Sequence, residues 1–152
     1  MKAILVQKDG RLVFDEVDVP KVGKDEVLVR VLACCVNRAD LMQKKGVYPA
    51  PTGTRNDILG LEFAGKIVEC GSEVSPRWNI GDAVMGIVSG CAYAQYLVIH
   101  HRLLLPVPKQ MSMEEAVCIP EVFLTAYDAM VMQMNLSRGD RFLVHAIGSG
   151  VG

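Results

Sequence analysis

The stretch Glu62–Cys70, with the sequence EFAGKIVEC, decides how the chain is expected to fold. It is a short, mostly apolar run, and the turn-forming residues Gly60 and Gly71 bound it. Such a run between turn residues is typical of a buried strand. We therefore predict one strand of a sheet at Glu62–Cys70.

Further segments of the same kind lie on both sides of this strand, with Gly, Pro and Asp between them. Leu12–Val19 and Ala92–Ile99 alternate apolar and polar residues, which is the period of a half-buried strand. The remaining predicted strands are Met1–Val6, Val27–Val36, Ala83–Val88 and Leu103–Val107. Many short strands at near-regular spacing indicate a small antiparallel barrel or sandwich.

The pattern changes near Met111. Ser112 and Glu115 have the spacing of a capping box, which predicts a short helix that ends at Pro120. The run 121–135 contains neither Gly nor Pro and has apolar residues on more than one face, so it predicts a helix buried between two layers. We also predict a buried strand over 141–146, which leads into the sequence IGSGVG at 147–152.

The composition excludes several classes of protein. Of 152 residues, 51% are hydrophobic and 22% are charged, with 16 basic against 17 acidic residues. This balance argues against disorder and against nucleic-acid binding by bulk charge. No apolar run approaches the roughly 20 residues of a membrane span, and the first ten residues contain no signal-peptide core.

Cysteines and histidines are the side chains that could form disulfides or bind metal ions. The five cysteines are odd in number, form no C-x-x-C motif and lie in apolar strings, which predicts buried free thiols in a reducing, cytoplasmic compartment. His100 and His101 are neighbours on a predicted strand. Neighbours on a strand point to opposite faces, so we expect that these two cannot share a metal ion.

The glycine-rich segment 147–152 follows the last predicted strand directly. A strand followed by glycines often opens a helix whose N-terminus binds phosphate. The complete βαβ unit needs roughly 30 residues, and these do not follow here. We therefore expect the chain to be a fragment, cut where a nucleotide-binding domain begins; the alternative is an ordinary glycine-rich tail.

Several sequence strings occur together in an order and spacing that point to one family. They are VNRADLM at 36–42, LGLEFAG at 59–65, IGDAV at 80–84, IPE at 119–121, LTAY at 124–127 and VHAIGSGVG at 144–152. The chain closely resembles the zinc-free quinone oxidoreductase, or zeta-crystallin-like, branch of the medium-chain dehydrogenases/reductases. The resemblance implies a mostly β, GroES-like partial barrel over 1–120. Residues 121–152 would then be a linking helix and the first strand and glycine turn of a truncated NADP-binding Rossmann domain.

The choice of the zinc-free branch depends on two positions. Zinc-dependent relatives have a cysteine where this chain has Asn37 and a histidine where it has Leu61, and they carry a lobe with four close cysteines that is missing here. Catalytic zinc needs about three strong protein ligands, which Glu62 alone cannot replace. We therefore expect no zinc. The resemblance implies hydride transfer from NADPH to a quinone or an activated alkene.

The resemblance also assigns roles to residues of the substrate pocket. Asn37 would line the pocket beside the nicotinamide, although it is equally placed to cap the helix that follows. Asp40 would order pocket waters, or serve only as the third helix residue that reaches back to Asn37. Tyr48 would donate a hydrogen bond to a quinone oxygen, and its alternative is surface packing. Glu62 is expected to pair with a base or to cap a turn.

The cofactor residues implied by the resemblance lie later in the chain. Thr125 would contact NADPH near its nicotinamide, or else bond to a carbonyl of its own helix. The amides of Ser149, Gly150, Val151 and Gly152 would bind the pyrophosphate, and the Ser149 hydroxyl would reach the pocket as a catalytic group. Gly148 departs from the family, which often has a larger residue there.

Partners and alternative functions complete these expectations. The family implies a homodimer formed through the missing Rossmann domain, so the 152-residue chain alone should lack turnover and bind NADPH weakly or not at all. A second reading is an NADPH-dependent enoyl or alkenal reductase of the same superfamily. A third, of another class, is a non-catalytic GroES-like or crystallin-like structural module.

Overall fold

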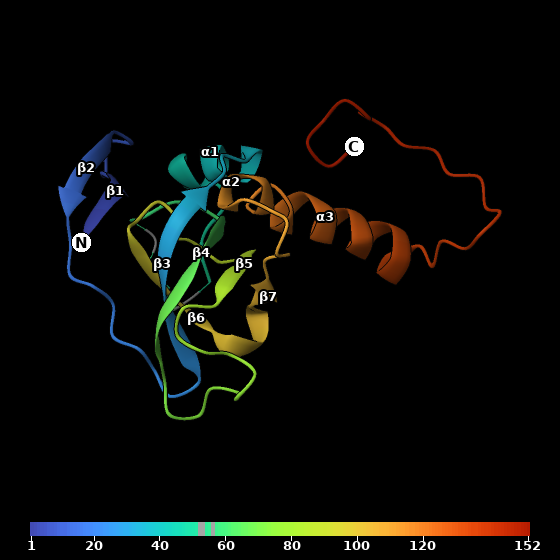
Figure 1. Cartoon of the computed structure of the whole chain (residues 1–152). Coiled ribbons are helices and arrows are strands. Elements are labelled where there is room, and N and C mark those ends of the chain that lie inside the picture. Colours follow the sequence, from blue (N-terminus) through green and yellow to red (C-terminus); the bar gives the residue numbers. More distant parts are fainter. Residues whose placement is uncertain (52–53, 56) are drawn as a thin grey trace.

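The computed structural model describes residues 1–51, 54–55 and 57–152, and within them the strands form two antiparallel sheets (Figure 1). β1 (Lys2–Val6) pairs with β2 (Leu12–Glu16) in a separate hairpin. The larger sheet has the order β6-β3-β4-β5-β7 and does not close. Its strands are β3 (Glu26–Cys34), β4 (Glu62–Cys70), β5 (Ala83–Ile87), β6 (Tyr96–His100) and β7 (Leu105–Pro106). The predicted mostly β, partial-barrel architecture is confirmed.

β4 is the central strand, and its bounds are those that the sequence predicts. It pairs with β3 on one side and with β5 on the other, so its backbone groups bond in both directions. Gly65 faces β3 where the register shifts between Val31 and Ala33. A Cβ at residue 65 would lie 2.2 Å from the carbonyl oxygen of Arg30, so only glycine permits this approach of the two strands.

The core lies against this sheet and contains mainly strand residues. Its buried members are Val27, Val29, Phe63, Ile67, Trp78, Val84, Ala92, Leu97, Ile99 and Leu104. The Trp78 indole is buried among them, and its Nε1 donates a hydrogen bond of 3.0 Å to the carbonyl of His101. A second cluster packs Ala64 and Met85 of the sheet against Ala116 and Val117. The sheet therefore supports the helices that follow it in sequence.

The helices are short. They are α1 (Arg38–Lys44), α2 (Met113–Ala116), α3 (Pro120–Tyr127) and a π-helix over Asp128–Gln133. The predicted capping box is confirmed, because the Glu115 amide bonds to Ser112 Oγ at 3.2 Å and the Ser112 amide to Glu115 Oε2 at 2.9 Å. The predicted role of Pro120 is wrong: it begins α3, where a missing N–H costs nothing.

The prediction that the helix after residue 120 is buried is also wrong. Phe123 is 65% exposed and Tyr127 is 53% exposed. Figure 1 shows α3 leaving the body of the domain, and none of the described elements covers its outer face. The apolar residues that predicted a helix between two layers are present. Within the described residues, however, α3 packs against one layer only.

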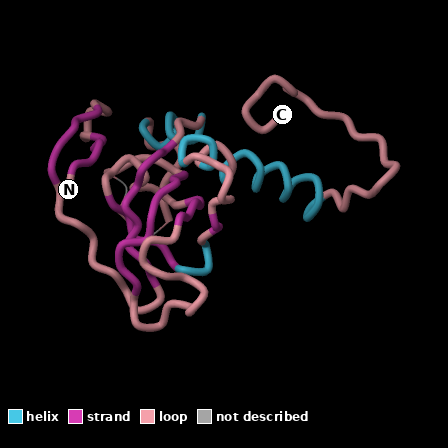
Figure 2. Tube along the Cα trace, in the orientation of Figure 1, coloured by secondary structure: helices cyan, strands magenta, loops and turns pink. Residues whose placement is uncertain are grey.

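The predicted strand at 141–146 does not form. The chain is irregular from residue 134 to its end and loops away from the sheets (Figure 2). A strand needs a neighbour to bond its N–H and C=O groups, and no described strand lies beside this segment. Leu143 is accordingly exposed.

Two predictions about reactive side chains need correction. All five cysteines are free, as expected, but none is buried: Cys34 and Cys118 are exposed and the other three are half-buried. β6 ends at His100 and a 3₁₀ helix (His101–Leu103) begins at the next residue, so the alternation of a strand stops there. The two imidazoles therefore lie on the same side, with ring centroids 4.9 Å apart. Among the described residues, no helix is both long and apolar enough to cross a bilayer.

Candidate functional site

Asn37 lies in the turn between β3 and α1, where two carboxylates hold it. Its backbone N–H donates to Asp40 Oδ2 at 2.6 Å, which is the reach-back that the sequence predicts for the third helix residue. Its side-chain Nδ2 donates to Glu62 Oε1 at 2.6 Å. The amide group is therefore fixed in orientation before any ligand binds.

Glu62 connects this turn to α3. The residue begins β4 and is only 2% exposed. Its second oxygen, Oε2, accepts a hydrogen bond of 2.9 Å from the backbone N–H of Glu121, in the first turn of α3. Glu62 was expected to pair with a base or to cap a turn. It caps the first turn of α3, and it takes part in none of the ion pairs found among the described residues.

The surroundings of Glu62 are strongly anionic. Asp40 is 2% exposed, and its Oδ1 has no hydrogen-bond partner among the described residues. Burial raises the pKa of the Glu121 carboxyl, and the negative charges of Glu62 and Asp40 raise it further. Three carboxylates thus lie close together, and the two buried ones, Asp40 and Glu62, act on Glu121 through their charge.

A pair of thiols lies beside the same turn. Cys35 Sγ is 3.7 Å from Cys118 Sγ, although the residues are 83 positions apart in the chain. Burial, with the hydrogen bond to Cys118, raises the pKa of the Cys35 thiol to about 12. The Tyr93 hydroxyl donates to the Cys35 carbonyl at 3.0 Å, and burial followed by the charge of Asp40 raises its pKa as well. Neither Cys35 nor Tyr93 is therefore ionised near neutral pH.

Tyr48 lies in the loop after α1 and lines a cleft of about 920 Å³. It is 47% exposed, and Leu61 and Glu121 line the same cleft. The structure thus places the predicted phenol over the same cavity as the helix start that Glu62 holds. Asn37 and Asp40 lie outside the lining of this cleft.

The predicted cofactor residues are less organised. Thr125 Oγ1 donates to the Glu121 carbonyl at 2.6 Å, which is the bond to its own helix that the sequence left as an alternative. Ser149 Oγ accepts a bond of 3.1 Å from the Gly152 amide. Ser149, Gly150, Val151 and Gly152 are exposed and irregular and begin no helix, so their phosphate-binding role remains a prediction.

The link that Glu62 makes between two distant segments was not predicted from the sequence, and neither were the positions of Tyr93 and Glu121. One indication of the first was available. Glu62 is a charged residue at the start of an otherwise apolar strand, and a buried carboxylate needs hydrogen-bond donors. The identity of those donors depends on segments 25 and 59 residues away, which no local pattern reveals.

Residues 23–109 match the alcohol dehydrogenase GroES-like domain. This chain belongs to that family. The GroES-like fold that the sequence resemblance implied is thereby confirmed, as is membership of the medium-chain dehydrogenase/reductase superfamily.

Individual GroES-like relatives include parts of large synthases as well as smaller proteins. The chain is 33% identical to a highly reducing polyketide synthase, cm3B of Cordyceps militaris, over 91% of this chain and 5% of the synthase. It is 32% identical to a mouse (Mus musculus) protein named synaptic vesicle membrane protein VAT-1 homolog-like, over 100% of this chain and 37% of that protein.

Solved structures of enzymes have the same fold. The CurK enoyl reductase superposes with a TM-score of 0.88 at 28% identity, over 99% of this chain and 48% of the enoyl reductase chain. A quinone oxidoreductase of Pseudomonas syringae superposes with a TM-score of 0.85 at 29% identity, over 99% of this chain and 47% of the enzyme. The chain thus spans about half the length of these structures.

Proposed function

We propose that residues 1–120 form the substrate-binding domain of an NADPH-dependent oxidoreductase that reduces quinones without zinc. Residues 121–152 would link this domain to a nucleotide-binding domain. The observation that carries the proposal is the hydrogen bond from Asn37 Nδ2 to buried Glu62, at the position where zinc-dependent relatives have a metal-binding cysteine. The likeness to a quinone oxidoreductase supports it.

A catalytic zinc ion does not fit the residues around Asn37. The Asn37 amide nitrogen is a donor with no free lone pair, so only the amide oxygen could bind a metal, and an amide oxygen is not among the usual ligands of zinc. Leu61 is buried and apolar, and both oxygens of Glu62 accept hydrogen bonds already. Without a Lewis acid, the carbonyl must be polarised by hydrogen bonds, which suits acceptors that need little activation, such as quinones.

The role of each residue follows from its position. Tyr48 would donate its phenolic proton in a hydrogen bond to a quinone oxygen at the cleft, where negative charge develops during reduction. Glu62 would hold Asn37 and the first turn of α3 in place. It would be a positioning residue, because it is buried and would not touch the substrate. Asp40 would fix the backbone of the Asn37 turn and order pocket waters.

NADPH, when bound, supplies the hydride. Thr125, Ser149, Gly150, Val151 and Gly152 are the residues that would hold it, with Asn37 beside the nicotinamide. The backbone around Gly148 is open, since no atom lies within 4 Å of a Cβ placed there, so a phosphate could approach this segment. A homodimer formed by the nucleotide-binding domains and a cytoplasmic location belong to the same proposal.

Replacing Tyr48 with Phe tests the mechanism in the whole protein. We expect kcat/KM for a 1,4-benzoquinone to fall by about tenfold, because one hydrogen bond to the developing charge is lost. Tyr48 is half-exposed, so the thermal unfolding midpoint should not move. Steady-state kinetics with NADPH measures the first quantity, and an unchanged kcat/KM would remove Tyr48 from the mechanism.

A second candidate is an NADPH-dependent enoyl or alkenal reductase, which the likeness to CurK and to polyketide synthases favours. Parallel assays of the whole protein with a benzoquinone and a crotonyl thioester separate the two. We expect the quinone to be reduced with the higher kcat/KM. Preference for the thioester would support the second candidate, and no NADPH oxidation with either would support a non-catalytic GroES-like module.

A further inference from the structure

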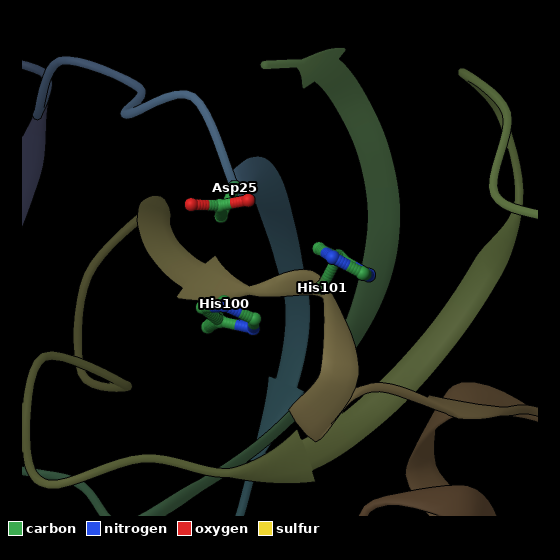
Figure 3. A group of neighbouring side chains, drawn as sticks. All are labelled: Asp25, His100 and His101. Atoms are coloured by element: carbon green, nitrogen blue, oxygen red, sulfur yellow. The ribbon is translucent and has the colours of Figure 1, made fainter. Parts of the chain in front are cut away.

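A group of three ligand-type side chains lies at the end of β6, apart from the residues that hold Asn37. Asp25, His100 and His101 each offer one atom, and these atoms all lie within 4.8 Å of one another (Figure 3). The chain has only three histidines, and two of them are here. No other group of three His, Cys, Asp or Glu side chains among the described residues is as close.

The backbone fixes the positions of these residues independently of their side chains. The His101 N–H donates to the Asp25 carbonyl at 3.0 Å, so the turn before β3 and the end of β6 are bonded directly. The Trp78 indole donates to the His101 carbonyl at 3.0 Å from within the core. His100 pairs with Glu26 in the β3–β6 ladder. The three side chains are therefore brought together by the fold.

The Asp25 carboxylate of this group forms no ion pair with the cations of nearby segments, within the part of the chain that the structure describes. Lys24 pairs with Glu73 at 3.3 Å, and the Arg77 guanidinium lies over the Trp78 ring at 4.5 Å. Asp25 is exposed and takes part in none of the ion pairs found among the described residues. The Asp25 carboxylate and the two imidazoles beside it can therefore bind a cation.

We propose that Asp25, His100 and His101 bind a divalent transition-metal ion, for which zinc is the natural probe. Two imidazoles and one carboxylate suit zinc, nickel or copper, whereas calcium and magnesium prefer oxygen ligands alone. Ligand atoms about 2.0–2.1 Å from a tetrahedral zinc lie about 3.3 Å apart. In this structure the two imidazole rings stack at an interplanar angle of 22°. The half-exposed His100 ring and the exposed Asp25 carboxylate must therefore rotate toward buried His101 before one ion can reach all three.

Binding has a definite local cost. His100 Nδ1 accepts a hydrogen bond of 3.2 Å from the Arg102 N–H. A metal on Nδ1 replaces this bond, and a metal on Nε2 places a proton on Nδ1, which also breaks it. Arg102 is exposed, so water can bond its N–H afterwards. We therefore expect micromolar affinity rather than the tighter binding of a structural zinc site.

Access to the site is open on one side. His100 also lines the cleft that Tyr48 lines, while His101 beside it is buried, with 9% of its surface exposed. Three protein ligands leave one position of a tetrahedral ion for water. The proposed site is independent of the proposed reductase function, because Asn37, Glu62 and Tyr48 contribute nothing to it.

Calorimetric titration of the reduced 152-residue chain with zinc chloride tests the proposal. We expect one ion per chain, with binding at least tenfold weaker in His100→Gln and clearly weaker in Asp25→Asn. The matched control is His145→Gln, which changes the remaining histidine and should leave binding unchanged. His101→Gln should also weaken binding, provided that far-UV circular dichroism shows a folded chain.

Nuclear magnetic resonance of the imidazole nitrogens gives a second readout. Zinc should shift the signals of His100 and His101 and leave those of His145 in place. The proposal is overturned if zinc shows no saturable binding, or if His100→Gln binds zinc as the unaltered chain does. It is also overturned if Cys118→Ser, rather than His100→Gln, abolishes binding, since the ion would then lie on the thiol pair.

Discussion

Two apolar segments of this chain, Glu62–Cys70 and residues 141–146, have opposite structures. The first is β4, paired on both sides, and Phe63 within it is fully buried. The second is irregular, and Phe142 within it is 40% exposed. An apolar run therefore becomes a strand only where neighbouring strands accept its backbone hydrogen bonds.

The largest expected effect comes from a matched pair of substitutions in these segments. Phe63→Ala should lower the free energy of unfolding of the 152-residue chain by about 3–5 kcal/mol, because it leaves a cavity in the core. Phe142→Ala should lower it by less than about 1 kcal/mol, because that side chain is partly solvated already. Urea denaturation measures both, and similar values would remove the contrast between the two segments.

Glu62→Gln sharpens the comparison at the polar start of β4. An amide offers one acceptor oxygen, so either the Asn37 amide or the Glu121 N–H would face another donor. We expect a loss of about 1–3 kcal/mol in the free energy of unfolding. The control is Glu69→Gln on the exposed face of the same strand, which should have almost no effect. An equal loss in both variants would contradict the bridging role of Glu62.

The smallest expected effect concerns Glu121 and pH. Because the fold raises its pKa, the folded chain holds this proton more tightly than the unfolded chain. Its contribution to stability is therefore present at low pH and is lost as pH rises through the raised pKa. Glu121→Gln should gain stability relative to the parent chain between pH 4 and pH 7, by less than about 1 kcal/mol since solvent screens the site.

Urea denaturation at both pH values checks this prediction. The hydrogen bond from the backbone N–H of residue 121 to the Glu62 carboxylate does not involve the replaced side chain. The variant should therefore keep it, and a change in helix capping does not confound the result. A difference between the two chains that is the same at pH 4 and pH 7 would show that neither burial nor the neighbouring carboxylates raise the pKa of Glu121.

Much of the fold could be predicted because its causes are local. β4 and the Ser112 capping box follow from apolar runs, turn residues and a three-residue spacing. The exposure of α3 and the absence of a strand at 141–146 could not be predicted, because both depend on which elements lie beside these segments. The imidazoles of His100 and His101 lie on one side because the backbone changes from strand to 3₁₀ helix at His101. No glycine or proline at this point indicates that β6 ends there.

The candidate site divides in the same way. Asn37 and Asp40 share a turn, and the bond between them was predictable from their spacing. The convergence of Glu62 with Asn37 and Glu121, and of Cys35 with Cys118, depends on tertiary packing across 25 to 83 residues. Tyr48 lies in the expected loop, yet only the folded chain shows that it shares a cleft with Glu121.

The two-sided bonding of Glu62 gives the molecule a mechanical property. One buried carboxylate, at the start of the central strand, is the common anchor of the turn that carries Asn37 and of the first turn of α3. A tilt of α3 that turns this carboxylate would therefore also move the Asn37 amide. Motion of the helix and the shape of the turn at Asn37 are coupled through two hydrogen bonds, without any intervening loop.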